Sequence, residues 1–126
     1  MTADGAVDRV VLVVDDDESI RETLELALDL EHYATAVASD GAEALQWLRN
    51  NPAPQLILLD LMMPIMDGWQ VLGHLGKDER LARIPVVVIT AFDRDLGSAG
   101  QLPILKKPID LRDLLRVVGA QVQTGA

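Results

Sequence analysis

The sequence predicts one α/β domain in which helices cover both faces of a five-stranded parallel sheet. Two patterns carry this prediction. Short apolar runs without alternation are typical of strands buried on both faces, and the stretches between them repeat apolar residues at helical spacing. A chain of 126 residues is the size of one domain. We therefore expect a single domain over residues 1–126, with a core from about residue 8 to residue 120.

The clearest predicted strand is residues 10–14, where every side chain is apolar and four of the five are β-branched valines. Similar runs predict three further strands, and a weaker run predicts one more. In chain order the five strands cover residues 10–14, 35–38, 56–59, 86–89 and 104–105. Strands that alternate with helices form a doubly wound sheet with right-handed crossovers. We hypothesise the strand order 2-1-3-4-5.

Four helices are predicted from apolar stripes that recur every three or four residues. Asp40 with Glu43 three residues later resembles a capping box at the start of the second helix, and Asp110 can cap the last one. The apolar faces lie within residues 20–28, 41–48, 68–75 and 111–118.

The segment Phe92–Pro103 is expected to hold at most one helical turn. It contains Gly97 and Gly100 and few apolar residues, and glycine weakens a helix. The helix between the fourth and fifth strands is therefore predicted to be short or absent.

Composition excludes several classes of function. With 11 Lys and Arg against 20 Asp and Glu, the net charge is -9, which disfavours direct contact with nucleic acid or anionic lipid. The absence of cysteine excludes disulfides, thiolate metal sites and cysteine nucleophiles. No apolar run is long enough for a signal core or a membrane span. We expect a cytoplasmic protein without membrane insertion.

Aspartates are predicted to gather at one edge of the sheet. Asp15, Asp16 and Asp17 follow the first strand and Asp60 ends the third; these strands are neighbours at the reversal of strand order, where ligand sites of such sheets lie. Carboxylates at one place repel each other unless a cation or proton intervenes, and oxygen ligands in an incomplete cage suit Mg²⁺ with phosphate oxygens. The sequence therefore predicts a magnesium and phosphoryl site, although the first three aspartates alone fit an acidic loop before a helix equally well.

Thr90 and Lys107 end the fourth strand and follow the fifth, and they add a hydroxyl and a positive charge to this edge. Each alone is more common as an ordinary strand-end or surface residue, so only their joint placement favours an anion site above Asp60. His32 and His74 lie outside every strand end and are interpreted as helix-surface or helix-end residues. The phosphoryl donor is then another molecule.

Four segments in this order resemble the receiver domain of two-component response regulators. They are Val-Leu-Val-Val-Asp-Asp-Asp-Glu-Ser-Ile-Arg-Glu-Thr-Leu at 11–24, Leu-Ile-Leu-Leu-Asp-Leu-Met-Met-Pro-Ile-Met-Asp-Gly at 56–68, Ile-Thr-Ala at 89–91 and Lys-Lys-Pro at 106–108. The resemblance covers nearly the whole chain and implies the flavodoxin-like strand order 2-1-3-4-5. It also implies a signalling domain, not an enzyme: a phosphohistidine on a sensor histidine kinase or a phosphotransfer protein passes its phosphoryl group to the receiver, which then changes its affinity for a downstream protein.

By this resemblance Asp60 is the phosphoacceptor, and Asp16 and Asp60 are direct ligands of Mg²⁺. Asp15 acts through metal-bound water, and the carbonyl of Met62 completes the metal shell.

The resemblance further implies that Thr90 bonds a phosphoryl oxygen and that Lys107 pairs with the phosphoryl charge. Lys107 is preferred to Lys106 because the family has a Lys-Pro pair whose peptide bond is cis in relatives. Met62 and Phe92 follow Asp60 and Thr90 by two residues, and we expect them either to flank the site or simply to pack the loops.

The sequence departs from the family in one region. Only 16 residues separate Thr90 from Lys107, fewer than relatives usually have, and Ile104 stands where relatives carry the aromatic residue that couples to the threonine. We expect the Phe92–Pro103 segment to take over that coupling.

Three alternatives remain beside a phosphorylated receiver. A degenerate receiver that serves only as a docking module fits the shortened segment. A haloacid-dehalogenase-like phosphatase would need a second aspartate where Met62 stands, and a flavodoxin-like nucleotide carrier would need a neutral phosphate loop in place of the three carboxylates after the first strand. Both of these are disfavoured.

Overall fold

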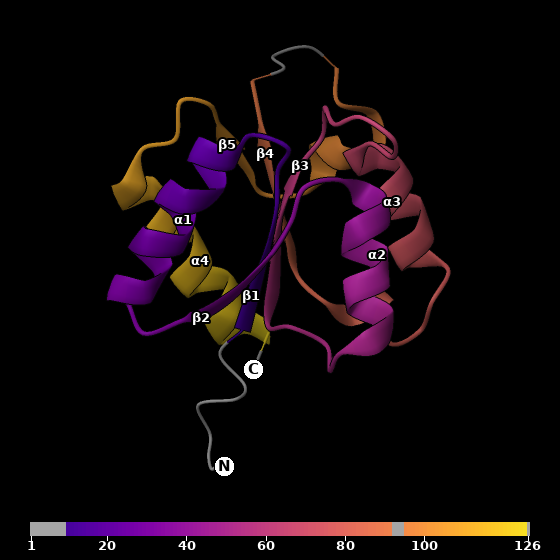
Figure 1. Ribbon diagram of the computed structural model, residues 1–126, viewed down its shortest axis with the longest axis horizontal. Coiled ribbons are helices and arrows are strands. Elements are labelled where there is room, and N and C mark those ends of the chain that lie inside the picture. The colour runs from indigo at the N-terminus through magenta and orange to yellow at the C-terminus, as the bar shows by residue number, and fades with distance from the viewer. Residues whose placement is uncertain (1–9, 92–94, 126) are drawn as a thin grey trace.

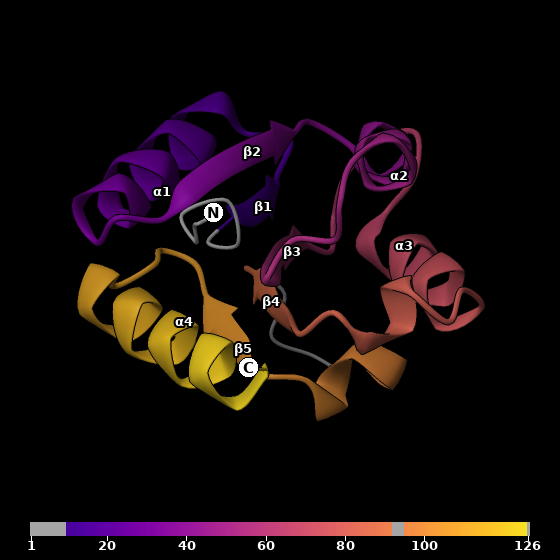
Figure 2. The ribbon, with the colours of Figure 1, turned by 90° about the horizontal axis from the view of Figure 1, so that it is seen from below.

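A five-stranded parallel sheet divides the molecule into two helical layers (Figure 1). The computed structural model describes residues 10–91 and 95–125. The strands run in the order β2-β1-β3-β4-β5, which confirms the predicted doubly wound sheet. Viewed along the sheet, α1 and α4 cover one face, whereas α2 and α3 cover the other (Figure 2). The strands are β1 (Val10–Val14), β2 (Ala34–Ala38), β3 (Leu56–Asp60), β4 (Val86–Thr90) and β5 (Ile104–Lys106).

The register of the strands brings their carboxyl ends to one edge. Val14 pairs with Leu59, Asp60 pairs with Ile89, and Thr90 pairs with Lys106. Residues that end or follow β1, β3, β4 and β5 therefore meet beyond the same side of the sheet, which is where ligand sites lie in folds of this kind.

The apolar strands are buried on both faces, as their unbroken sequences predict. In β1, Leu12 and Val14 pack in the core beneath α2 and α3, whereas Val11 and Val13 pack in the core beneath α1 and α4. All of these side chains are fully buried. Burying both faces of a strand removes much apolar surface from water and fixes its position in the sheet.

The helices begin at carboxylate caps. Asp40 accepts a hydrogen bond from the Glu43 amide at 2.8 Å, and Asp110 accepts one from the Arg112 amide at 2.8 Å, as predicted. The return bond of a capping box is absent at Asp40, because Glu43 accepts from the Ser39 amide instead. The helices are α1 (Glu18–Leu30), α2 (Gly41–Asn50), α3 (Gly68–Gly76) and α4 (Leu111–Gly125), with a short 3₁₀ turn η2 at Leu81–Arg83. None of the described helices is long and apolar enough to cross a membrane.

One 3₁₀ turn, η3 (Gly97–Gln101), stands between β4 and β5. This agrees with the predicted short or absent fourth helix; Phe92 lies outside the described residues. The turn is anchored rather than loose, because the indole Nε1 of Trp69 on α3 donates a hydrogen bond to the Leu96 carbonyl at 2.8 Å. Leu96 and Ala99 are also buried against Leu61, the residue after Asp60.

Gly68, the first residue of α3, allows the helix to approach the end of β3. A Cβ atom at this position would lie 2.5 Å from the Asp60 carbonyl oxygen and 2.8 Å from Leu61 Cα, which are backbone atoms that cannot turn aside. The Gly68 amide also donates to the Leu61 carbonyl at 2.9 Å. The packing of α3 and the position of Asp60 therefore depend on the missing side chain.

We predict that Gly68→Ala destabilises the protein by about 1–3 kcal/mol, the usual cost of forcing atoms into a packed site. Gly73→Ala, on the same helix, is the matched control. A Cβ atom there meets nothing within 4 Å, so alanine should stabilise the protein by about 0.5–1 kcal/mol through its better helix propensity. Chemical denaturation measures both values, and equal effects at the two positions would contradict the close-approach argument.

Candidate metal and anion site

Three of the predicted aspartates meet beyond the ends of β1 and β3. Asp15 follows β1 and Asp60 ends β3, and both are buried, whereas Asp16 is exposed. One carboxylate oxygen of each lies within 4.8 Å of the others. Asp17 does not join them: its carboxylate accepts hydrogen bonds from the Ser19 and Ile20 amides at 2.9 and 3.2 Å and caps α1.

Hydrogen bonds on both sides fix the backbone of Asp15. Its amide donates to the Ala38 carbonyl at 3.1 Å, and its carbonyl accepts from Arg21 Nη1 at 2.7 Å. Its carboxylate Oδ1 accepts from the Asp17 amide at 2.9 Å. The other carboxylate oxygen, Oδ2, is buried without any hydrogen bond in the described part of the chain.

Lys107 supplies the positive charge of the site. Its Nζ lies 3.0 Å from Asp15 Oδ2, an ion pair outside hydrogen-bonding angles, and 3.5 Å from Asp60 Oδ2. Its amide donates to the Thr90 carbonyl at 2.9 Å, and the Lys107–Pro108 peptide bond is cis. Burial lowers the pKa of Lys107, but its contacts with Asp15 and Asp60 outweigh that effect, so the pKa lies above its usual value.

Asp60 is the most perturbed carboxylate of the site. Burial and repulsion by Asp15 raise its pKa to about 6, although the charge of Lys107 and the hydrogen bond from the Met62 amide act in the opposite direction. That amide lies 3.4 Å from Asp60 Oδ1. The Lys107 ammonium therefore does not offset the burial and the repulsion at Asp60, and the site favours one further positive charge.

Thr90 and Met62 also lie at this edge. Thr90 is fully buried at the end of β4, on the strand that pairs with β3. The Met62 side chain is 57% exposed and so is free of the core. Lys106 is exposed on β5, whereas the Nζ of Lys107 reaches the carboxylates.

The donor set fits a hard divalent cation. Three carboxylates each place an oxygen within 4.8 Å of the others. The Asp15 Oδ2 oxygen accepts no hydrogen bond among the described residues and faces only the Lys107 ammonium, at 3.0 Å. The raised pKa of Asp60 means that a cation would relieve an unfavourable repulsion. Protein oxygen ligands on one side of an open site are the pattern that Mg²⁺ shares with phosphate groups and water.

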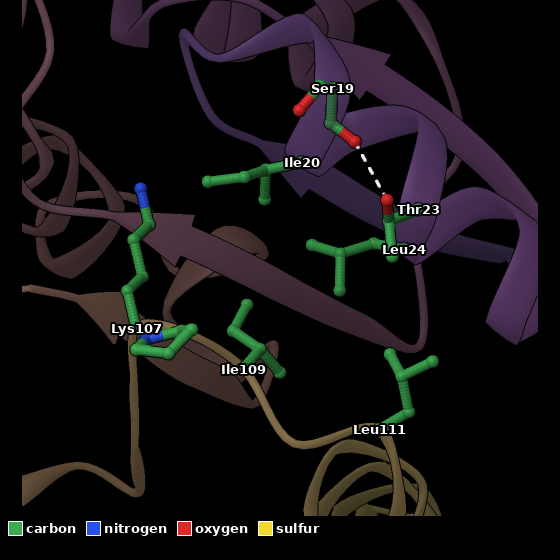
Figure 3. A pocket seen from close by; sticks show the side chains of 8 residues that line it. Ser19, Ile20, Thr23, Leu24, Lys107, Ile109 and Leu111 are labelled. Carbon is green, nitrogen blue, oxygen red and sulfur yellow. Dashed lines mark hydrogen bonds between the residues drawn. The ribbon is translucent and has the colours of Figure 1, made fainter.

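A crevice of about 180 Å³ lies beside the acidic cluster, between α1 and the chain that leads from β5 to α4. Figure 3 shows that Ile20, Leu24 and Ile109 face one another across it, with Lys107 at one end. Thr23 does not add a free hydroxyl, because its Oγ1 donates to the Ser19 carbonyl at 2.9 Å. The crevice is therefore mainly apolar next to a charged site.

The sequence matches the response regulator receiver domain over residues 11–119. The chain belongs to this family. It is 41% identical to the response regulator MprA of Mycobacterium sp. strain KMS over 113 residues, which cover 83% of this chain and 46% of that protein. It is 37% identical over 115 residues to the DNA-binding dual master transcriptional regulator RpaA of Synechocystis, covering 87% of this chain and 47% of that protein.

The receiver also superposes on a solved receiver domain, that of the Francisella response regulator 1452. The TM-score is 0.81 at 30% sequence identity, and the match covers 94% of this chain and 99% of the other. The chain spans about half the length of the two curated relatives named above. Receiver domains take part in two-component signalling, in which an aspartate is phosphorylated, and the acidic pocket required for this is present here.

Sequence reasoning missed the roles of two residues beside the site. Asp17 is the N-cap of α1 and not part of the acidic cluster, and its position directly before the helical period is a capping signal. Arg21 was not singled out, because its contact with the Asp15 carbonyl depends on how α1 packs against β1 and has no signature in residue spacing.

The raised pKa of Asp60 predicts a pH-dependent stability in Mg²⁺-free buffer. The unfolded chain releases the Asp60 proton near pH 4, whereas the folded chain holds it to about pH 6. Folded protein binds more protons in that interval, so this contribution is fully present below pH 4 and is lost as pH rises through 6. Relative to Asp60→Asn, the parent should therefore lose about 1–3 kcal/mol of unfolding free energy between pH 4 and pH 7.

Urea unfolding of both proteins in EDTA at several pH values measures this difference. Asp29→Asn, which removes an exposed carboxylate of α1, is the control and should follow the parent. A constant difference between the parent and Asp60→Asn across the range would contradict the perturbed pKa.

Proposed function

We propose that Asp60 of this receiver accepts a phosphoryl group from a phosphohistidine on a sensor histidine kinase or a phosphotransfer protein. The observation that carries the proposal is the placement of Asp60: it is buried beside Asp15, lies 3.5 Å from Lys107 Nζ, and shares the sheet edge with the exposed Asp16. Asp15, Asp16, Asp60 and the Met62 carbonyl are the proposed Mg²⁺ ligands. The metal would supply positive charge that neutralises the phosphoryl oxygens.

In the proposed step, an ionised oxygen of Asp60 attacks phosphorus, an oxygen–phosphorus bond forms, and the nitrogen–phosphorus bond of the donor histidine breaks. A pKa of about 6 leaves Asp60 mostly ionised at neutral pH yet more basic than an exposed carboxylate. Such a transfer needs mainly positioning and charge stabilisation from the protein.

Lys107 and Thr90 are proposed to hold the transferred group. Lys107 Nζ already lies between the carboxylates of Asp15 and Asp60, so a short movement takes it to a phosphoryl oxygen on Asp60. The Thr90 hydroxyl, at the end of the neighbouring strand, is proposed to donate to a second oxygen. The arrangement transfers a group onto the protein itself, so we propose a phosphorylated signalling domain and not an enzyme with turnover on a separate substrate.

The apolar crevice beside Lys107 supports a protein as the donor. Ile20 and Ile109, both partly exposed, offer apolar contact next to the acidic edge, which a small phosphodonor would not use. Residues 1–126 are proposed to act as one receiver unit whose output is contact with a downstream protein. The net charge of -9 argues against direct contact with nucleic acid.

The η3 turn supports the proposed output. Leu61 follows Asp60 and packs with Leu96 and Ala99 of the turn region, and Trp69 holds the Leu96 carbonyl. Relatives couple the threonine to the surface through an aromatic residue at the position of Ile104, which this chain lacks. We therefore propose that the packing of Leu61 against Leu96 and Ala99 transmits the conformational change from Asp60 and Thr90 to the surface. A phosphorylation-independent docking module is the second candidate, favoured only by the short connection between β4 and β5.

We predict that acetyl phosphate with Mg²⁺ adds one phosphoryl group to the protein and that Asp60→Asn abolishes the addition. Asp16→Asn should lower the Mg²⁺ affinity at least tenfold because it removes a proposed direct ligand. Glu79→Gln removes one exposed charge far from the site and is the control for Asp16→Asn. Intact-mass spectrometry and Mg²⁺ titration give the readouts.

Undiminished phosphorylation of Asp60→Asn would contradict the choice of acceptor. Failure of the parent to be phosphorylated by acetyl phosphate, and by a panel of phosphorylated histidine kinases, would favour the docking module instead.

A further prediction concerns Thr90. Beryllofluoride, a phosphoryl mimic, should change amide hydrogen exchange in residues 95–102. The bound group is expected to accept a hydrogen bond from the Thr90 hydroxyl, and Leu61, next to Asp60, packs against this segment. Thr90→Ala should remove that change while phosphoryl transfer persists, and Thr90→Ser, which keeps the hydroxyl, should retain it. In a Trp47→Phe background, Trp69 is the only indole and its fluorescence gives a second readout. Exchange changes confined to residues 15–17 and 60–63 would rule this route out.

A further inference from the structure

Arg21 stands in an electrostatically unfavourable place. It lies in the first turns of α1, where its amide donates to the Asp17 carbonyl at 3.0 Å. The amino end of a helix carries partial positive charge, so a cation there is disfavoured, while Glu18 in the same turn has the favourable sign. A positive charge at this unfavourable position suggests that the Arg21 side chain makes a favourable contact outside the helix.

The guanidinium of Arg21 forms no ion pair among the described residues. Among the described residues, no carboxylate lies within ion-pair distance of it; instead Nη1 donates to the carbonyl oxygen of Asp15 at 2.7 Å. The side chain is half-buried, so this charge-assisted bond is partly shielded from water. Arg21 therefore holds the backbone carbonyl of Asp15, the residue that lies between the end of β1 and the exposed Asp16.

Three hydrogen bonds hold Asp15. Its amide donates to Ala38, its Oδ1 accepts from the Asp17 amide, and its carbonyl accepts from Arg21. The remaining oxygen, Oδ2, has no hydrogen bond among the described residues and lies 3.0 Å from the Lys107 Nζ. Without such restraint, repulsion among the carboxylates of Asp15, Asp16 and Asp60 would push the β1–α1 turn outward. Lys107 offsets this repulsion at Asp15 and Asp60 but makes no ion pair with Asp16 in the described part of the chain.

We infer that Arg21 is a positioning residue that keeps the Asp15–Asp17 turn in its cation-binding form while no cation is bound. The inference rests on the proposed Mg²⁺ site and adds to it a residue that contacts no ligand atom. A group that is already restrained loses less conformational entropy when it binds a ligand, so the restraint increases the affinity for that ligand.

The sign of the effect separates this role from simpler ones. If Arg21 acted only through its charge, removing it would strengthen Mg²⁺ binding, because one nearby repelling cation would be gone. If it only stabilised α1, its loss would lower global stability and leave Mg²⁺ affinity unchanged. A positioning role predicts weaker binding together with local opening of the turn.

Arg21→Met keeps much of the apolar stem and removes the guanidinium, so we expect roughly tenfold weaker Mg²⁺ binding by calorimetric titration. In EDTA, amide exchange of residues 16–19 should become at least fivefold faster, and saturating Mg²⁺ should restore most of the protection. Arg21→Lys, which can still donate to the Asp15 carbonyl, should recover most of both properties. Arg49→Met, which makes the same charge change at an exposed position of α2, is the control.

Stronger or unchanged Mg²⁺ binding by Arg21→Met, or exchange of residues 16–19 equal to that of the parent in EDTA, would overturn the inference. The exchange measurement in EDTA involves neither metal nor phosphoryl transfer. It therefore tests the restraint itself even if the parent protein fails to bind Mg²⁺ or to be phosphorylated, the results that would refute the proposed function.

Discussion

Repulsion among Asp15, Asp16 and Asp60 is the constraint on which the site and its surroundings depend. One oxygen of each carboxylate lies within 4.8 Å of the others, and two of the three side chains are buried. Such close, buried like charges persist only when other contacts hold them in place. Fully buried apolar strands on both sides supply that enforcement. Lys107 offsets part of the charge without removing it. The repulsion that remains favours a further positive charge at this edge of the sheet.

Much of the fold follows from the sequence because the strongest signals are local. Unbroken valine and leucine runs identify β1, β3 and β4, and the carboxylates Asp40 and Asp110 mark where helices begin. Once β1 and β3 are taken as neighbours, the convergence of Asp15 and Asp60 follows from the geometry of parallel strands alone. The short connection before β5 was also predictable, because Gly97 and Gly100 and the scarcity of apolar residues are properties of the segment itself.

The remainder depends on contacts between segments that sequence spacing does not encode. That Lys107 reaches two carboxylates on different strands requires the loop after β5 to turn back over the sheet edge. The need for glycine at position 68 arises from how close α3 comes to the Asp60 carbonyl. Each of these is set by tertiary packing, which overrides local propensity.

The short turn η3 bears on how a binding protein distinguishes this receiver from related receiver domains. A protein that binds a long helix between β4 and β5 would find there, among the residues that the structure describes, only the five-residue turn η3, held by the hydrogen bond from the Trp69 indole to the Leu96 carbonyl. Such a protein gains little contact area on this chain and dissociates quickly. The short crossover therefore removes, from the described part of the chain, the surface on which a partner of that kind would depend.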